Sequence, residues 1–332
     1  MKRADLLLIW VLLLGTAVLI TAPLIGPKLL SPTLFWSGAE SLDARILREI
    51  RIPRVLAAFT AGAVLALGGM TFQAMFRNPL ATPYTLGIAG GASFAAALAI
   101  QLGWIASCFG VSLISLAAFV GACGVILLVF GLSRFRADFS TETLLLAGVT
   151  LSFFFSSMIL TLQYLSDPTR TFRMLRWMMG GLEGAAGYRD WLAILLPALP
   201  AVVALAAMRH EMNLLALGEE WAIGRGVALA RTKAVLLGLV GWMVASVVAV
   251  CGPIGFVDLI VPHICRLLVG PDHRRLFPVT LACGGAFLVI CDTAARTVLA
   301  PTEIPVGIVT SLLGGPFFLW LLVRRSPNAG VS

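Results

Sequence analysis

Charged residues are scarce in this sequence of 332 residues. Only 12% of the residues are Asp, Glu, Lys or Arg, whereas 59% are hydrophobic and the mean hydropathy is +0.98. A soluble globular chain usually carries about 25% charged residues. This chain therefore cannot cover a water-facing surface of its size with polar side chains. That excludes a cytosolic enzyme, a nucleic-acid-binding protein and a disordered scaffold, despite the net charge of +8.

The sequence patterns of common reactive sites are missing as well. There is no G-x-x-x-x-G-K-[ST] motif, so the chain has no P-loop for nucleotide hydrolysis. The three histidines form no H-E-x-x-H pair and the six cysteines include no C-x-x-C pair, which indicates neither a zinc site nor a disulfide framework. We therefore expect no catalytic residue, no metal ligand and no cofactor, and we interpret the cysteines as small apolar packing residues.

Long uncharged runs are the main feature of the sequence. Between Arg77 and Arg134 there are 56 consecutive residues without a charged side chain. As one helix, at about 1.5 Å per residue, this run would be roughly 84 Å long, against a hydrocarbon core of about 30 Å. It must hold at least two crossings, with the break expected at residues 101–103. The other expected crossings are residues 6–27, 55–76, 143–166, 191–208, 234–257, 276–291 and 304–323, with an irregular one at 252–270.

The expected fold is therefore all-α: a polytopic membrane protein with a single transmembrane domain, residues 1–332, and about ten membrane-spanning helices. An even number of crossings places both termini on one side. Basic residues next to the first and last crossings place that side in the cytoplasm. The first segment should be retained as a helix, because its uncharged stretch of 22 residues is longer than the hydrophobic region of about 7–15 residues in a signal peptide.

Ten of the 24 basic residues lie outside on this topology, a weak bias for the basic-loop rule, and three arginines among them need a separate explanation. Arg51 and Arg54 stand three apart at the start of the second helix, hence on one face, and Arg296 stands at the outer end of the ninth. A protein partner with acidic patches would explain basic residues placed outside. Side chains that extend to the lipid headgroups are the alternative explanation.

Acidic residues inside the predicted crossings are nearly absent. Asp258 and Asp292 are the exceptions, and Asp292 stands four residues before Arg296, which favours an ion pair within one helix. An ion-coupled secondary carrier needs ionisable groups or unwound helices at mid-membrane. A secondary carrier therefore stays open as an alternative, with a membrane-bound enzyme as a more distant one.

The longest inside loop, at about residues 212–230, joins the sixth and seventh crossings. It predicts a short amphipathic helix that starts near Gly218, continues through Glu219, Glu220 and Trp221, and is ended by glycine at Gly226. A helix that presents acidic and apolar side chains suits a groove on a partner protein. A helix lying on the bilayer surface is the alternative.

A series of motifs runs in order along nearly the whole chain. The motifs are R-I-P-R at 51–54, F-R-N-P-L-A at 76–81, T-L-G-I at 85–88, G-P-I-G-F-V at 252–257, G-P-D-H-R-R at 270–275 and I-P-V-G-I-V-T at 304–310. With these motifs the chain resembles the permease subunits of type II ABC importers, the FecCD-type family that moves ferric siderophores, haem and cobalamin. Asp258 departs from the pattern, which has a small residue there.

The resemblance implies partners and site residues. It implies a homodimer in the inner membrane with the pathway at the dimer interface, two cytoplasmic ATPase subunits that hydrolyse the ATP, and a periplasmic or lipid-anchored substrate-binding protein. It implies that Gly218, Glu219, Glu220, Trp221 and Gly226 belong to the helix that contacts the ATPase. It also implies that Arg51, Arg54 and Arg296 receive acidic residues of the binding protein, and that Asn78, Leu80, Ser140 and Thr141 form the cytoplasmic gate. Iron chelates are the first expected cargo and cobalamin the second.

Overall fold

The computed structural model describes residues 3–36, 41–104, 106–108, 111–135, 141–185 and 187–324, and these are mostly helical. The helices are α1 (Arg3–Thr21), α2 (Leu42–Arg45), α3 (Ile52–Met75), α4 (Ile88–Gln101), α5 (Leu113–Phe135), α6 (Thr141–Leu165), α7 (Pro168–Met178), α8 (Tyr188–Ala207), α9 (Arg209–Leu217), α10 (Glu219–Gly224), α11 (Leu229–Cys251), α12 (Val257–Val269), α13 (His273–Thr297) and α14 (Val306–Arg324). Two strands of two residues each, β1 (Ser107–Cys108) and β2 (Val111–Ser112), pair antiparallel. The predicted all-α class is confirmed.

Long apolar helices account for most of the predicted crossings. Six described segments are long and apolar enough to span a membrane: Leu42–Met75, Leu113–Leu132, Thr143–Leu165, Tyr188–Ala207, Leu229–Cys251 and His273–Thr297. Shorter apolar helices cover Ile9–Leu24, Ile88–Gln101 and Val306–Trp320, and α12 adds a helix of 13 residues with Pro262 inside it. The chain is thus a multi-pass membrane protein. The count of ten crossings and the cytoplasmic placement of both termini stay predictions.

The helix boundaries agree with the sequence in most places and differ in two. The predicted break at residues 101–103 is confirmed, since α4 ends at Gln101 and Gly103 has a φ of +71°. Helix α11 ends at Cys251, six residues before the predicted end of that crossing, because Gly252 has a φ of +66° and Pro253 cannot continue a helix. Helix α7 was not predicted, because its arginines make it too polar to count as a crossing.

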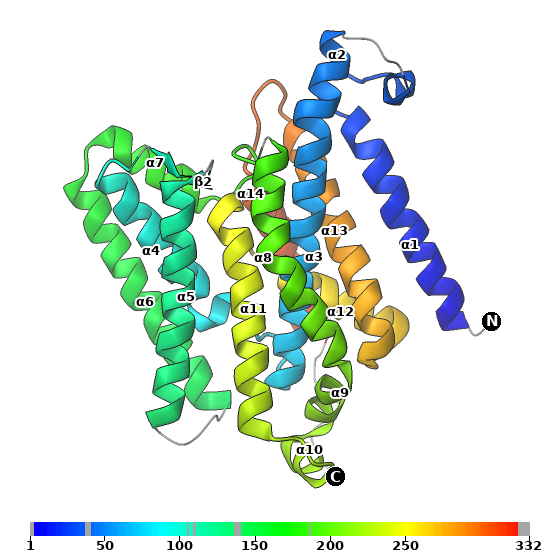
Figure 1. The fold of residues 1–332 in the computed structure, drawn as a ribbon, viewed down its shortest axis with the longest axis vertical. Helices are drawn as coiled ribbons and strands as arrows, with labels where there is room; N and C mark the ends of the chain where they lie inside the picture. Colours follow the sequence, from blue (N-terminus) through cyan, green and yellow to red (C-terminus); the bar gives the residue numbers. More distant parts are fainter. Residues whose placement is uncertain are drawn as a thin grey trace.

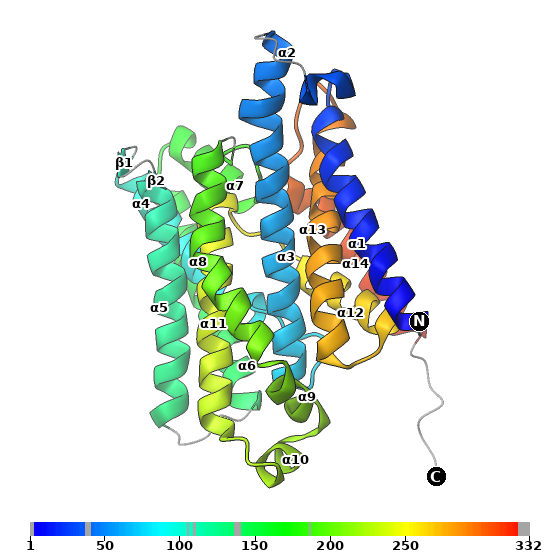
Figure 2. The same ribbon diagram turned by 45° about the vertical axis from the view of Figure 1, so that its right-hand side comes forward.

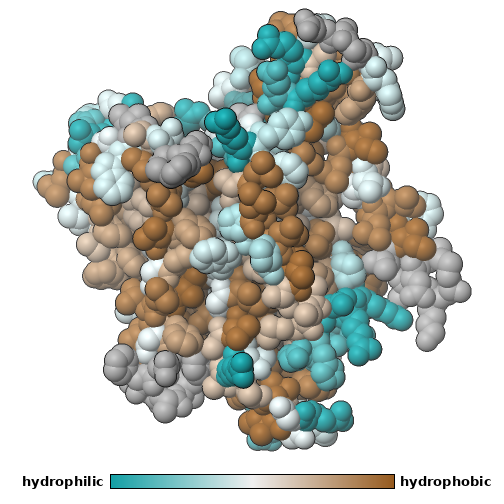
Figure 3. Space-filling model, viewed as in Figure 1, coloured by the Kyte–Doolittle hydropathy of each residue, from teal (hydrophilic) through white to brown (hydrophobic). Residues whose placement is uncertain are grey.

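The bundle has two distinct ends (Figures 1 and 2). Helices α2 and α7 and the β1–β2 pair lie at one end, and α9 and α10 lie at the other. We call these the α7 end and the α10 end. Figure 3 shows apolar side chains over most of the middle of one face, with hydrophilic side chains gathered toward the two ends. This distribution matches a bundle whose middle lies in lipid and whose ends meet water.

Helix α3 is the centre of the bundle. In its most apolar window 83% of the residues are buried, against 22% in α5, α6 and α8. It packs against α8, α11, α12 and α13 (Figure 1). Its sequence suits that position, because alanines and glycines fill most of its middle and allow neighbouring helices to approach closely.

The closest approach joins α3 to α13 at a pair of glycines. A methyl group added at Gly62 would lie 2.2 Å from the carbonyl oxygen of Gly284, and one added at Gly284 would lie 2.6 Å from the carbonyl oxygen of Gly62. The two backbones therefore touch with no room for a side chain between them. This crossing fixes the position of α3 along α13.

A single methyl group at this crossing should destabilise the protein. We expect Gly62→Ala to cost at least about 1–3 kcal/mol, because the added carbon overlaps backbone that cannot rotate away. The readout is the melting temperature of the purified protein in detergent. Gly238→Ala in α11 is the matched control, since an added methyl group there meets no atom within 4 Å. Equal melting temperatures for the two variants would contradict the proposed contact.

Candidate functional sites

The three arginines predicted to lie outside gather at the α7 end and are buried. Arg51 and Arg54 are each 8% exposed and Arg296 is 4% exposed. Arg51 directly precedes α3, Arg54 lies in its first turn, and Arg296 lies in the last turn of α13. A buried guanidinium needs compensating partners, because its transfer out of water is expensive. The chain supplies those partners itself.

Arg54 is held by two carboxylates. Its Nε lies 3.2 Å from both carboxylate oxygens of Asp292, and its Nη2 donates to Asp292 Oδ1 at 3.0 Å. Its Nη1 donates to Glu303 Oε2 at 2.8 Å. The two acids differ in exposure, since the side chain of Asp292 is 1% exposed and that of Glu303 is 35% exposed. Arg54 therefore joins α3 to α13 on one side and to the α13–α14 loop on the other.

Asp292 also pairs with Arg296. The distance between Arg296 Nε and Asp292 Oδ2 is 3.0 Å, so the ion pair predicted from the four-residue spacing is confirmed. Arg296 further donates to the carbonyl of Ile25 at 3.4 Å and to Thr293 Oγ1 at 3.2 Å. One buried carboxylate thus serves two guanidinium groups from two helices.

Arg51 uses carbonyl oxygens instead of an acid. Its Nη2 donates to the carbonyl of Lys28 at 2.9 Å, and its Nη1 lies 3.3 Å from the carbonyls of Pro23 and Leu24. These three carbonyls belong to the segment that follows α1. Arg51 therefore fixes the chain between α1 and α2 against the start of α3.

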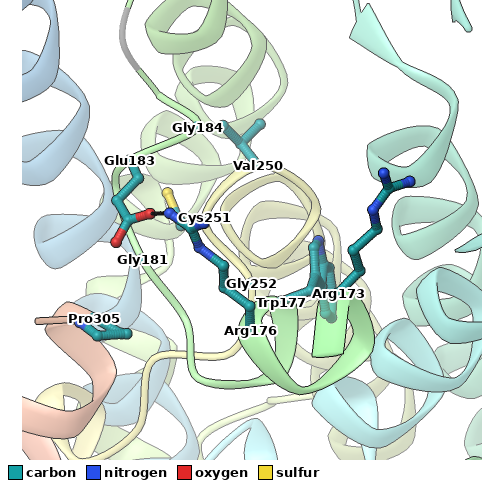
Figure 4. A pocket seen from close by; sticks show the side chains of 10 residues that line it. All are labelled: Arg173, Arg176, Trp177, Gly181, Glu183, Gly184, Val250, Cys251, Gly252 and Pro305. Atoms are coloured by element: carbon teal, nitrogen blue, oxygen red, sulfur yellow. Dashed lines mark hydrogen bonds and ion pairs between the residues drawn. The ribbon is translucent and has the colours of Figure 1, made fainter. Parts of the chain in front are cut away.

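We call Arg51, Arg54 and Arg296, with the groups that they contact, the arginine network. Helix α7 borders this network and carries its own basic residues. Asp167 caps its first turn, and the N–H of Arg170 donated to that carboxylate lowers the pKa of Asp167. Arg176 is paired with Glu183, and Figure 4 shows Arg173 projecting on the other side of Trp177. These side chains line a cavity of about 240 Å³ between α7, the end of α11 and Pro305.

At the α10 end, the loop of about residues 212–230 contains two helices. α9 ends at Leu217 and α10 begins at Glu219, because Gly218 between them has a φ of +138° that reverses the chain. Gly226, also with a positive φ of +83°, follows α10. The short helix predicted from about Gly218 to Gly226 is therefore confirmed as α10, whereas α9 is not predicted.

The side chains of α10 divide into an inward and an outward set. Trp221 and Ile223 are 65% and 57% exposed, and Ala222 between them is fully buried. Glu220 is exposed, whereas Glu219 Oε1 accepts from Lys233 Nζ of α11 at 2.7 Å. The side chain of Lys233 is 1% exposed, so this pair anchors α10 on the bundle. No local pattern reveals this role of Lys233, since a lysine close to a crossing normally faces water.

Helix α9 is tied to the start of α13 by Asn213. The Asn213 side chain donates to Asp272 Oδ1 at 2.8 Å and accepts the backbone N–H of His273 at 2.8 Å. The backbone N–H of Arg274 and the amide of Asn213 together lower the pKa of Asp272. This contact links the α10 end to the same helix that carries Asp292 and Arg296.

Two of the residues predicted for the gate, Asn78 and Leu80, follow the end of α3. Asn78 Oδ1 accepts the N–H of Leu80 at 2.9 Å, which forms a tight turn, and Leu80 is 48% exposed. The turn that follows packs on α6, where a methyl group added at Gly148 would lie 2.3 Å from the carbonyl oxygen of Thr85. Thr141 is the first residue of α6, and Ser140 lies outside the described residues. Within the described ranges, no three His, Cys, Asp or Glu side chains are placed to hold a metal ion.

Two curated proteins of similar length match nearly the whole chain. The hemin transport system permease protein HmuU of Yersinia pestis is 37% identical over 326 residues, which cover 96% of this chain and 94% of that protein. The vitamin B12 import system permease protein BtuC of Escherichia coli O139:H28 is 37% identical over 325 residues, 95% of each chain.

A solved structure agrees with these relatives. An inward-facing conformation of a metal-chelate type ABC transporter superposes with a TM-score of 0.86 at 33% identity, covering 96% of this chain and 99% of that one. The model of the FecCD transport family matches residues 7–324. From the fold, the relatives and this match, the chain belongs to the FecCD transport family and is a permease of the ABC importer type.

Proposed function

We propose that this permease moves a ferric siderophore, haem or cobalamin-type chelate inward across the inner membrane. The cargo arrives on a substrate-binding protein, and two ATPase subunits supply the free energy. The observation that carries the proposal is the family membership of nearly the whole chain. The bundle fits this function, because α10 exposes apolar side chains at one end and the arginine network lies at the other. The α10 end is then cytoplasmic and the α7 end periplasmic.

The cargo class follows from the relatives. Their names record hemin and vitamin B12, two large metal-centred macrocycles, and the solved neighbour is of metal-chelate type. Iron chelates are our first choice and cobalamin the second. An ion-coupled carrier receives no support from Asp292, because that carboxylate is already shared by two arginines.

The exposed apolar helices support the proposed pairing of two copies. Phe153 and Leu160 on α6 are 73% and 65% exposed, and Leu312 and Leu319 on α14 are 70% and 66% exposed. We assign α6 and α14 to the interface of a homodimer with the pathway along it, and Asn78, Leu80, Ser140 and Thr141 to its cytoplasmic gate. Lipid would cover the same side chains in a monomer.

Uptake driven by ATP is the direct test of this function. The permease, reconstituted in proteoliposomes with its ATPase and its binding protein, should import a ferric siderophore or cobalamin only when ATP is present. Collapse of the proton gradient should leave the rate unchanged. Uptake that needs no ATP and stops when the gradient is collapsed would establish an ion-coupled carrier instead.

The outward side chains of α10 should hold the ATPase. We expect Glu220→Arg combined with Trp221→Ala to leave the permease folded and to abolish co-purification of the ATPase, because both side chains point away from the bundle. Leu29→Ala combined with Arg45→Glu, exposed positions at the other end, is the matched control. Unchanged assembly and unchanged ATP hydrolysis in the α10 variant would remove this helix from the coupling role.

The arginine network should hold the binding protein. We expect Arg54→Glu or Arg296→Glu to weaken docking, with a steeper loss as salt rises, since loss of one partner from a desolvated ion pair costs about 2–5 kcal/mol. Either change also places a carboxylate next to Asp292, so ATPase co-purification serves as the control for folding. An acid-to-Lys change on the binding protein should restore part of the affinity. If charge reversal at Arg51, Arg54 and Arg296 together leaves the affinity unchanged, these residues have no role in docking.

A further inference from the structure

The two acids that hold Arg54 are not equivalent. Asp292 contacts Arg54 Nε and Nη2, also pairs with Arg296, and is almost fully buried. Glu303 accepts one hydrogen bond from Arg54, from Nη1 to Oε2 at 2.8 Å, and about a third of its side chain is exposed. An incoming carboxylate could therefore replace Glu303 without disturbing Asp292.

Arg54 and Glu303 face a hollow at the α7 end. The hollow has a volume of about 670 Å³ and is also lined by Phe172, Met179, Arg176 and Glu183. It contains two arginine–glutamate pairs, Arg54 with Glu303 and Arg176 with Glu183, so its charges balance. A hollow of this kind offers no free positive charge to an acidic protein until one of the internal glutamates leaves its arginine.

We propose that Glu303 occupies the place on Arg54 that an acidic side chain of the docked binding protein takes, so that docking exchanges one carboxylate for another. The proposal rests on the proposed function. Arg54 keeps Asp292 throughout and is never left unpaired, which avoids the large penalty of an uncompensated buried charge. Because one charge-assisted hydrogen bond replaces a similar one, the net gain is small and the binding protein can leave again.

When Glu303 leaves Arg54, the loop between α13 and α14 is released. This loop connects the exchange to the proposed pathway. Glu303 lies in the segment between α13 and α14, and the N–H of Gly307 in the first turn of α14 donates to the carbonyl of Gly180 at 3.1 Å. Gly180 stands two residues after the end of α7. The chain around Glu303 thus leads directly to the start of α14, which is hydrogen-bonded to the residue pair after α7. A change in the position of Glu303 therefore acts on this contact between α14 and α7.

The sign of one affinity change tests the exchange. Glu303→Gln in the complete transporter, held in nanodiscs, should bind the binding protein about 5–10-fold more tightly than wild type, because a neutral amide competes poorly for Arg54. Glu303→Ala should tighten binding at least as much. Glu183→Gln is the matched control: it adds the same charge to the same hollow but leaves Arg54 and Glu303 paired. Its affinity should stay within about twofold of wild type.

Each result has a distinct meaning. Weaker or unchanged binding by both Glu303 variants, with wild-type ATPase assembly, overturns the exchange and leaves Glu303 as a holder of its loop. Equal tightening by Glu183→Gln also overturns it, because the effect is then one of net charge in the hollow. A wild-type permease that binds no binding protein at all overturns the proposed function and the exchange with it.

Discussion

The ion pair between Arg54 and Asp292 is the constraint on which much of this bundle depends. It joins the first turn of the central helix, α3, to the outer part of α13, and it does so where both groups are nearly inaccessible to water. Farther along, the same two helices touch at Gly62 and Gly284. A charged contact near one end and a contact between backbones in the middle fix the two helices in register.

The few charges of this chain are concentrated where they hold elements together. Lys233 pairs with Glu219 at the α10 end, and the arginines pair with Asp292 and Glu303 at the α7 end. Only 12% of the residues are charged. Each buried ion pair therefore favours one relative position of the two elements that it joins over other positions. The exposed side chains left over, such as Trp221 at one end and Arg173 at the other, are the ones available to partners.

The sequence predicts what depends on short spacing and misses what depends on distant contacts. Helix boundaries such as Gln101 follow from local composition, and the Asp292–Arg296 pair follows from a spacing of four residues. The outer location of Arg54 follows from counting crossings. Its partner Glu303 stands 249 residues away, and no local pattern connects the two.

Buried polar residues are the hardest to predict. Lysines are almost never fully buried unless they are paired, and the partner of Lys233 stands 14 residues earlier, beyond a turn. The division of α9 from α10 had a local signal in Gly218, but the angle between the two helices depends on a φ of +138° that composition does not reveal. Helix α7 is not predicted because apolar runs identify the crossings, and a helix with three arginines contains no such run.

Helix α13 runs without interruption from the contact with Asn213 to the turn that holds Arg296, and its 25 residues span about 37 Å. In the proposed importer, the partners at both ends therefore act on one continuous element. Thermodynamic linkage then imposes reciprocity: whatever factor docking at one end contributes to nucleotide affinity at the other, the nucleotide contributes to docking affinity. A nucleotide state that favours inward release must loosen or tighten the binding protein by that same factor. The permease can thus control when the binding protein dissociates, without any further contact between the two partners.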